Sequence, residues 1–246
     1  MKLKRVLFLC AVFGLAAMIV YSGHRLWDIN QDYAAEAAFH NQVLQYKPAL
    51  QTALEDGGPS VNPSIADLRA KYPDVVGWLT IPGTAIDYPF AQSTDNDYYL
   101  HRDLDGKSLT AGTLFMDFRD QADFTGFNTV IYGHDMKNGS MFGTLQQYSD
   151  QAFANTKTTG TISLADKTFA IEFFAFVVVR PDDAEIYDPM ISQAQDRDAF
   201  LDYVKTTARH YRDIDLTVND HFVTLSTCTY EFSNARMVLV GKLVRK

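Results

Sequence analysis

The segment Thr224-Leu225-Ser226-Thr227-Cys228 ends in one of the two cysteines of the chain, and a second strand-like segment, Ala235–Val240, follows after a short connection. Both segments are rich in β-branched and aliphatic residues, as strands are. The short connection predicts antiparallel neighbours, which places Cys228 and Arg236 at the same end of one sheet. A thiol beside a fixed guanidinium is a candidate catalytic pair. A buried structural cysteine beside a surface arginine would give the same pattern.

The overall composition is that of one globular domain, once the N-terminal residues are set aside. The chain has 246 residues, 47% of them hydrophobic, and a formal net charge of −8. Nucleic acid is excluded as a partner, because phosphate binding needs clustered Lys and Arg, and basic runs occur only at the extreme N-terminus. The sequence has no CxxC and no HExxH motif, so we expect no metal and no cofactor. Asp95-Asn96-Asp97 lacks further spaced oxygen ligands and is interpreted as a turn, not a calcium site.

The N-terminus has the pattern of a membrane-targeting segment. Met1–Arg5 is basic, and Val6–Tyr21 contains no charged residue. This pattern is typical of a secretory signal or a membrane anchor. Because Ala16-Ala17-Met18 is a poor cleavage site, we favour an uncleaved anchor. The positive-inside rule then predicts a single-pass protein of the cell membrane, with a cytoplasmic N-terminus and an extracellular catalytic domain.

We expect three parts along the chain. Residues 1–27 would form the basic start and the anchor, 28–60 a helical stalk and linker, and 61–246 the catalytic domain. In the stalk, apolar residues recur at helical spacing. Pro48 is expected to kink or restart this helix, and the glycine-rich segment Asp56–Ser60 is expected to form the linker.

The domain itself is predicted to be mainly β with peripheral helices. Asn62 is expected to cap a short helix that reaches about Ala70, Ser140 to cap a second over Met141–Tyr148, and a third helix to span Asp196–Arg209. The strand candidates are short apolar runs between turn residues: Val76–Ile81, Ala85–Pro89, Gly112–Asp117, Asn128–Tyr132, Gly160–Leu164, Phe169–Arg180, Phe222–Thr227 and Arg236–Val244. Many short strands separated by turns favour a closed or sandwiched β fold.

A cysteine nucleophile needs a partner that takes its proton or lowers its pKa, since a free thiol is mostly protonated at neutral pH. Of the six histidines, His134 directly follows the strand-like run Val130–Gly133. Loops at strand ends often carry catalytic groups, whereas His24 and His40 fall in the predicted stalk. Arg236 does not titrate at working pH, so it would act as a fixed donor to a developing oxyanion.

With these residues in view, the sequence resembles the sortases, the cysteine transpeptidases of Gram-positive bacterial surfaces. Thr224–Cys228 matches the TLxTC signature of that family. Other segments resemble class B sortases in the same order along the chain: Pro73–Thr84, Asp95–Leu100, Phe115–Asp117 and Tyr132–Met136. The resemblance runs from about Ile65 to the C-terminus and includes the long connection, with its helix, before the cysteine strand.

The resemblance implies a closed, eight-stranded sortase β-barrel with Cys228, His134 and Arg236 as its catalytic group. In the implied reaction, the thiolate attacks the carbonyl of a Thr in a C-terminal sorting signal of a surface protein. The guanidinium stabilises the oxyanion, and the imidazolium protonates the leaving amine. An amine then resolves the thioester; in class B it usually belongs to a peptidoglycan cross-bridge, and in some relatives it is a pilin lysine.

The same resemblance implies a groove that binds the sorting signal. Its residues would be Asn96, Leu100, Tyr132 and Ser226, with Ile186 and Tyr187 on the opposite wall. Each of these positions also has an ordinary structural interpretation, as a core, turn or strand residue.

Three other functions stay open at this point. A pilin-polymerising sortase, the first, would transfer the acyl group to a pilin lysine. A cysteine endopeptidase or hydrolase on the same scaffold would form the same thioester and release it with water. A membrane-anchored binding module without catalysis is the third alternative, and the presence of Cys228, His134 and Arg236 argues against it.

Overall fold

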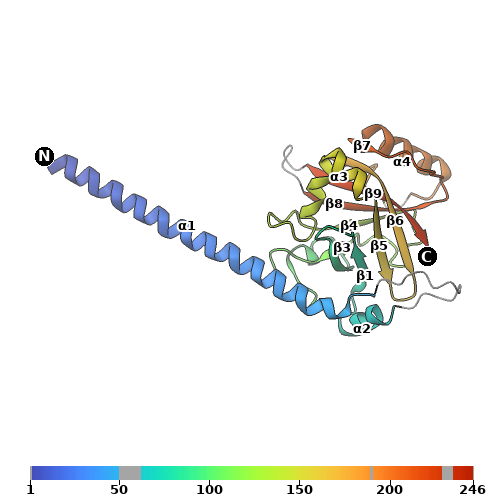
Figure 1. Ribbon diagram of the computed structural model, residues 1–246, viewed down its shortest axis with the longest axis horizontal. Coiled ribbons are helices and arrows are strands. Elements are labelled where there is room, and N and C mark those ends of the chain that lie inside the picture. The colour runs from blue at the N-terminus through green and yellow to red at the C-terminus, as the bar shows by residue number, and fades with distance from the viewer. Residues whose placement is uncertain (1, 50–61, 189–190, 229–234, 246) are drawn as a thin grey trace.

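The computed structural model describes residues 2–49, 62–188, 191–228 and 235–245. A single long helix, α1 (Lys2–Val43), extends away from a β-barrel and contacts it only with its C-terminal end (Figure 1). Large apolar side chains of its N-terminal half, such as Phe8, Phe13 and Val20, are exposed. In the described part of the chain, this is the one helix long and apolar enough to cross a membrane.

The helix α1 differs from the predicted stalk in where it ends. It runs without interruption past residue 27 to Val43, and a 3-10 turn, η1 (Leu44–Tyr46), follows. Helical conformation is disfavoured just before a proline, so the helix ends ahead of Pro48 instead of bending at it. The predicted linker Asp56–Ser60 lies outside the described residues, and the three-part division of the chain stays a prediction.

The barrel is closed by eight strands, as predicted. Its strands are β1 (Val75–Thr80), β2 (Asp87–Ala91), β3 (Leu114–Met116), β4 (Asn128–Tyr132), β5 (Thr159–Leu164), β6 (Thr168–Val179), β8 (His221–Cys228) and β9 (Arg236–Arg245). They pair in the order β5-β1-β2-β3-β4-β8-β9-β6, and pairing of β5 with β6 closes the ring. A two-residue strand that sequence periodicity did not predict, β7 (His210–Tyr211), lies beside β6.

Short helices surround the barrel. They are α2 (Pro63–Lys71), η2 (Tyr98–His101), η3 (Gly143–Ser149), α3 (Gln151–Thr156) and α4 (Ala194–Thr207). The predicted helices near Pro63 and Asp196 are confirmed as α2 and α4. Asn62, however, does not cap α2, because its side-chain amide donates to the Leu164 carbonyl at 2.6 Å and so fastens the helix to β5.

The predicted α-helix over Met141–Tyr148 is wrong. That segment forms the 3-10 helix η3, whose first residue follows Phe142, and the Ser140 hydroxyl donates to Asn138 instead of capping a helix. The capping side chain belongs to Asp150, which accepts from two backbone N–H groups at the start of α3. A carboxylate at this position satisfies N–H groups that have no partner inside a helix.

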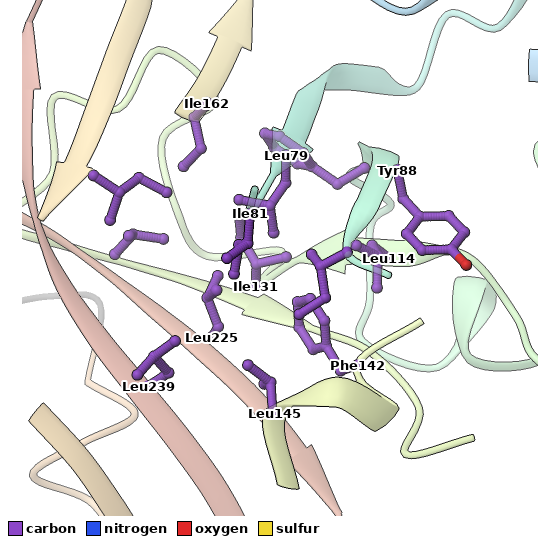
Figure 2. Packing of buried hydrophobic residues seen from close by; sticks show 14 of the residues in the cluster. Leu79, Ile81, Tyr88, Leu114, Ile131, Phe142, Leu145, Ile162, Leu225 and Leu239 are labelled. Carbon is purple, nitrogen blue, oxygen red and sulfur yellow. The ribbon is translucent and has the colours of Figure 1, made fainter. Parts of the chain in front are cut away.

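The barrel interior is filled by aliphatic side chains from most of its strands, including Leu79, Ile131, Leu225 and Leu239 (Figure 2). Strand β8 shows the expected alternation, since Val223 joins Leu225 in the interior while Phe222 packs outside against α4. A rigid, packed barrel of this kind fixes the strand ends, where the candidate site lies.

Candidate active site

The register between β4 and β8 brings two predicted catalytic positions together. The strands are parallel, and Tyr132 pairs with Ser226. The ladder continues for one more bond, because the Gly133 N–H donates to the Ser226 carbonyl at 3.1 Å. His134 and Cys228 each follow this pair by two residues. Their backbones therefore leave the same edge of the sheet side by side.

Gly133 is required for this approach. A Cβ at this position would lie 2.4 Å from Leu114 Cδ2 and 2.8 Å from the Phe142 ring. Any larger residue would push the chain away from the barrel wall, and the backbone of His134 would move with it.

The antiparallel pair β8–β9 adds the third position. Cys228 is directly opposite Arg236 in the register, as the sequence predicted for two strands joined by a short connection. The Arg236 side chain is half-buried, and its Nη1 donates to the Ala235 carbonyl at 3.2 Å. The backbone positions of Cys228, His134 and Arg236 therefore lie at one end of three neighbouring strands.

A pocket of about 380 Å³ opens at this end, and His134 and Arg236 both line it. Five of the six predicted groove residues line the same pocket: Asn96, Leu100, Tyr132, Tyr187 and Ser226. The Tyr187 hydroxyl and Ser226 Oγ are 2.8 Å apart, so the long connection before β8 is hydrogen-bonded to the strand that carries the cysteine.

Ile186 differs from its expected position. Its side chain is fully buried in the core between the barrel and α4, in the cluster that contains Phe200 and Phe222, and it does not line the pocket. Its carbonyl accepts a hydrogen bond from the Asn128 side chain at 3.2 Å. Neighbouring residues of this segment point in different directions, so Tyr187 alone of the two reaches the pocket.

His134 is held in one orientation by the loop across the pocket. Its Nε2 lies 2.7 Å from the Leu100 carbonyl, and its ring stacks on His101 with centroids 5.4 Å apart. Because a carbonyl only accepts, Nε2 carries a proton, and Nδ1 is the acceptor of the neutral ring. Burial lowers the pKa of His134; the bond to Leu100 opposes this effect, and the nearby His101 adds to it.

Asp117 is a buried anion beneath the pocket, and sequence reasoning assigned it no role. It accepts from Arg119 Nε and Nη2, both at 2.9 Å, and from the Asn96 amide and the Tyr132 hydroxyl, both at 3.0 Å. Burial alone would raise the pKa of Asp117, but the hydrogen bonds, those of Arg119 first, outweigh burial and lower it. One carboxylate therefore orients two predicted groove residues.

Arg119 is a second guanidinium in the pocket wall that the sequence did not point out. Besides its bonds to Asp117, it donates from Nη2 to the Tyr187 carbonyl at 3.1 Å, which ties together opposite sides of the pocket. Phe115 extends the wall, with its ring 5.3 Å from that of Tyr132. In the sequence, the pair Asp117 and Arg119 is visible only as an acidic and a basic residue just after a short strand, which is a weak indication of a role in the site.

Replacing Asp117 with Ala is expected to lower the free energy of unfolding by about 3 kcal/mol, because several partly buried donors lose a fully buried acceptor. Since the folded-state pKa is lowered, this stabilisation is present above the unfolded pKa and is lost as the pH falls through the folded value. Urea unfolding at neutral pH and at about pH 3 measures both effects. The control Asp166→Ala, at an exposed carboxylate, should cost under about 0.5 kcal/mol. Equal losses in the two variants would contradict the role of Asp117.

Comparisons with known proteins agree on one family. A family model for the sortase domain matches residues 79–244. Sortase B of Listeria monocytogenes is 34% identical over 252 residues, which span 100% of both chains. Sortase B of Staphylococcus aureus is 27% identical over 247 residues, 100% of this chain and 99% of that one. The solved Staphylococcus aureus sortase B–substrate complex has a TM-score of 0.78 at 27% identity, covering 87% of this chain and 99% of that one.

The barrel topology and the family match define the class: the chain belongs to the sortase family. Similarity over the full length is to sortase B, which makes it a class B member of this family of cysteine transpeptidases.

Proposed function

We propose that the chain is a membrane-anchored transpeptidase that cleaves a C-terminal sorting signal after Thr and transfers the surface protein to an amine of a peptidoglycan cross-bridge. The observation that supports this most is the strand register. It brings the backbones of Cys228, His134 and Arg236 to one end of three adjacent strands, beside a pocket large enough for a peptide segment.

In the first half-reaction, the Cys228 thiolate attacks the Thr carbonyl, and a C–S bond forms. Negative charge moves to the carbonyl oxygen, where the guanidinium of Arg236 stabilises it. When the intermediate collapses, the C–N bond breaks and the amine leaves with a proton from the imidazolium of His134. The product of this half-reaction is a thioester on Cys228.

In the second half-reaction, the incoming amine attacks the thioester, and neutral His134 accepts its proton. The C–S bond breaks and the thiolate is restored, so no net proton or electron is consumed. The lowered pKa of His134 suits this second role, because more of the ring is neutral at physiological pH. The same lowering reduces the share of imidazolium available to the first half-reaction, and we therefore expect slow turnover.

The pocket supports recognition of an extended peptide. Asn96 and Tyr132 are fixed from below by Asp117, and Tyr187 and Ser226 are fixed by each other. Polar groups held in this way are oriented before a substrate arrives, which lowers the entropic cost of binding. With α1 in the membrane and the N-terminus in the cytoplasm, the barrel lies outside the cell, where surface proteins and cross-bridge amines are available.

Profiling cleavage of a peptide library with the full-length protein, with and without an amine acceptor, tests the proposed function. We expect cleavage after Thr and an amide product whenever the acceptor is present. Free acid as the sole product in both conditions would indicate the hydrolase alternative. Transfer to a lysine side chain but never to a cross-bridge amine would indicate a pilin-polymerising enzyme.

Arg236→Lys is expected to lower kcat by about 10²-fold with a small change in KM, because an ammonium cannot reproduce the planar set of donors aimed at the oxyanion. Steady-state kinetics of peptide cleavage measure the effect. The control Arg180→Lys changes an exposed arginine in the same way and should keep wild-type rates. A variant at Arg236 that retained kcat would remove this residue from the mechanism.

A further inference from the structure

The C-terminal end of α1 forms part of the packed domain. Glu36, His40 and Val43 recur at helical spacing on one face, and this face lies against the barrel. Val43 is 1% exposed, and Glu36, although an acid, is 5% exposed. The His40 ring packs on Tyr88 of β2 with centroids 4.3 Å apart. A buried carboxylate at such a junction needs hydrogen-bond partners, and here the partners are on the barrel.

The hydrogen-bond partner of Glu36 also contacts the loop that follows His134. The Tyr88 hydroxyl, itself buried, donates to Glu36 Oε1 at 3.2 Å and accepts from the Met141 N–H at 3.3 Å. A carboxylate of α1 is thus joined, through the Tyr88 hydroxyl, to Met141 in the loop that follows His134.

This loop, residues 135–142, is closed on itself at His134. Asp135 and Met141 pair as an antiparallel bridge, and the Phe142 N–H donates to the His134 carbonyl at 2.9 Å. Met141 has a φ of +51°, in the left-handed region that side chains disfavour. Such a conformation persists only where surrounding contacts hold it, and the bond from Met141 to Tyr88 is one of these contacts.

We propose that Glu36 is a positioning residue for His134, acting through Tyr88 and the loop 135–142, so that the anchor helix is part of the catalytic architecture. The inference rests on the proposed function for its kinetic consequence. With the carboxylate in place, the Tyr88 hydroxyl is oriented to accept from Met141, and the loop fixes the backbone of His134. Without the Glu36 carboxylate, the Tyr88 hydroxyl no longer holds Met141 in place. The loop then becomes more mobile, and the imidazole of His134 is less well aligned with the pocket.

The test uses the full-length protein in lipid nanodiscs and removes one hydroxyl. Tyr88→Phe keeps the ring that packs on His40 but deletes the bonds to Glu36 and Met141. The matched control is Tyr72→Phe. Tyr72 accepts from the Gln42 side chain of α1 at 3.0 Å, so this variant also loses a helix–barrel hydrogen bond, at a point not connected to the loop. Glu36→Ala removes the carboxylate, and Glu36→Gln retains an acceptor oxygen.

We expect Tyr88→Phe and Glu36→Ala to lower kcat about tenfold with KM nearly unchanged, since small misplacements of a catalytic group are costly. Amide hydrogen exchange in residues 135–142 should rise about tenfold in both variants. Tyr72→Phe should match the wild type, and Glu36→Gln should restore most of kcat. A rise in exchange without loss of kcat would overturn the proposal, and so would equal effects of Tyr88→Phe and Tyr72→Phe.

The NMR titration of the His134 imidazole separates this inference from the proposed function. It requires no turnover, so it can be read even if no sorting peptide is ever cleaved. A titration curve that moves in Tyr88→Phe but not in Tyr72→Phe supports positioning by the anchor helix. Identical curves in both variants would refute such positioning, even in an enzyme that is fully active as a transpeptidase.

Discussion

A Cys228→Ala variant is expected to form neither the thioester nor the transfer product, with a loss of at least about 10⁴-fold in turnover. Alanine has no atom that can form the acyl bond, and the remaining residues of the site bind the peptide without cleaving it. Chromatography of a sorting peptide incubated with the full-length variant and an amine measures the loss.

The natural control is the other cysteine of the chain. Cys10 is exposed on α1, in the segment predicted to lie in the membrane and far from the barrel end. Cys10→Ala should therefore turn over at the wild-type rate. The melting temperature of Cys228→Ala should stay near that of the wild type, which separates lost chemistry from lost folding. If Cys228→Ala kept the transfer activity and Cys10→Ala lost it, the assignment of Cys228 as the nucleophile would be contradicted.

His134→Gln is expected to lower kcat by about 10³-fold, because one side chain serves as acid in the first half-reaction and as base in the second. The wild-type pH profile should be bell-shaped. Burial lowers the pKa of His134, so the acid limb should have its midpoint below the ordinary histidine value of 6.5. This limb should vanish in His134→Gln.

A neighbouring histidine provides the control for this prediction. His101 stacks on His134, and its charge helps to lower the pKa of His134. His101→Gln should retain the bell shape and keep kcat within about tenfold of wild type, while the acid limb moves toward higher pH. An unchanged acid limb in His134→Gln would assign that titration to another group.

The apolar alternation along strands such as β8 was sufficient to predict a closed or sandwiched β fold, and the resemblance to the sortases added the closed, eight-stranded barrel. Prediction from the sequence pattern failed where a local conformational preference competes with contacts formed on folding, or where an element is very short. Ser140 precedes an apolar run and has the chemistry of a helix cap, but its hydroxyl donates to the Asn138 side chain instead, and the helix starts later as η3. The strand β7 is two residues long, which is too short to carry any period.

The site shows the same division between local and long-range information. The positions of Cys228, His134 and Arg236 at strand ends could be inferred from the chain order, and their proposed catalytic roles came from the resemblance to the sortases. Asp117 and Arg119 acquire their roles through contacts made on folding, and Arg119 reaches a carbonyl 68 residues away. Ile186 and Tyr187 could not be told apart because only the folded loop decides which one faces the pocket.

Detection of the covalent intermediate is the most direct test of the proposed cysteine transpeptidation. Intact-mass spectrometry of the full-length protein, mixed with a sorting peptide and quenched early, should show an added mass equal to the acyl fragment, located at Cys228 by peptide mapping. A chase with a peptide amine should remove this mass and yield the matching amide. A wild-type protein that cleaves the peptide without ever carrying the acyl group on Cys228, or that releases only free acid during the chase, would contradict cysteine transpeptidation.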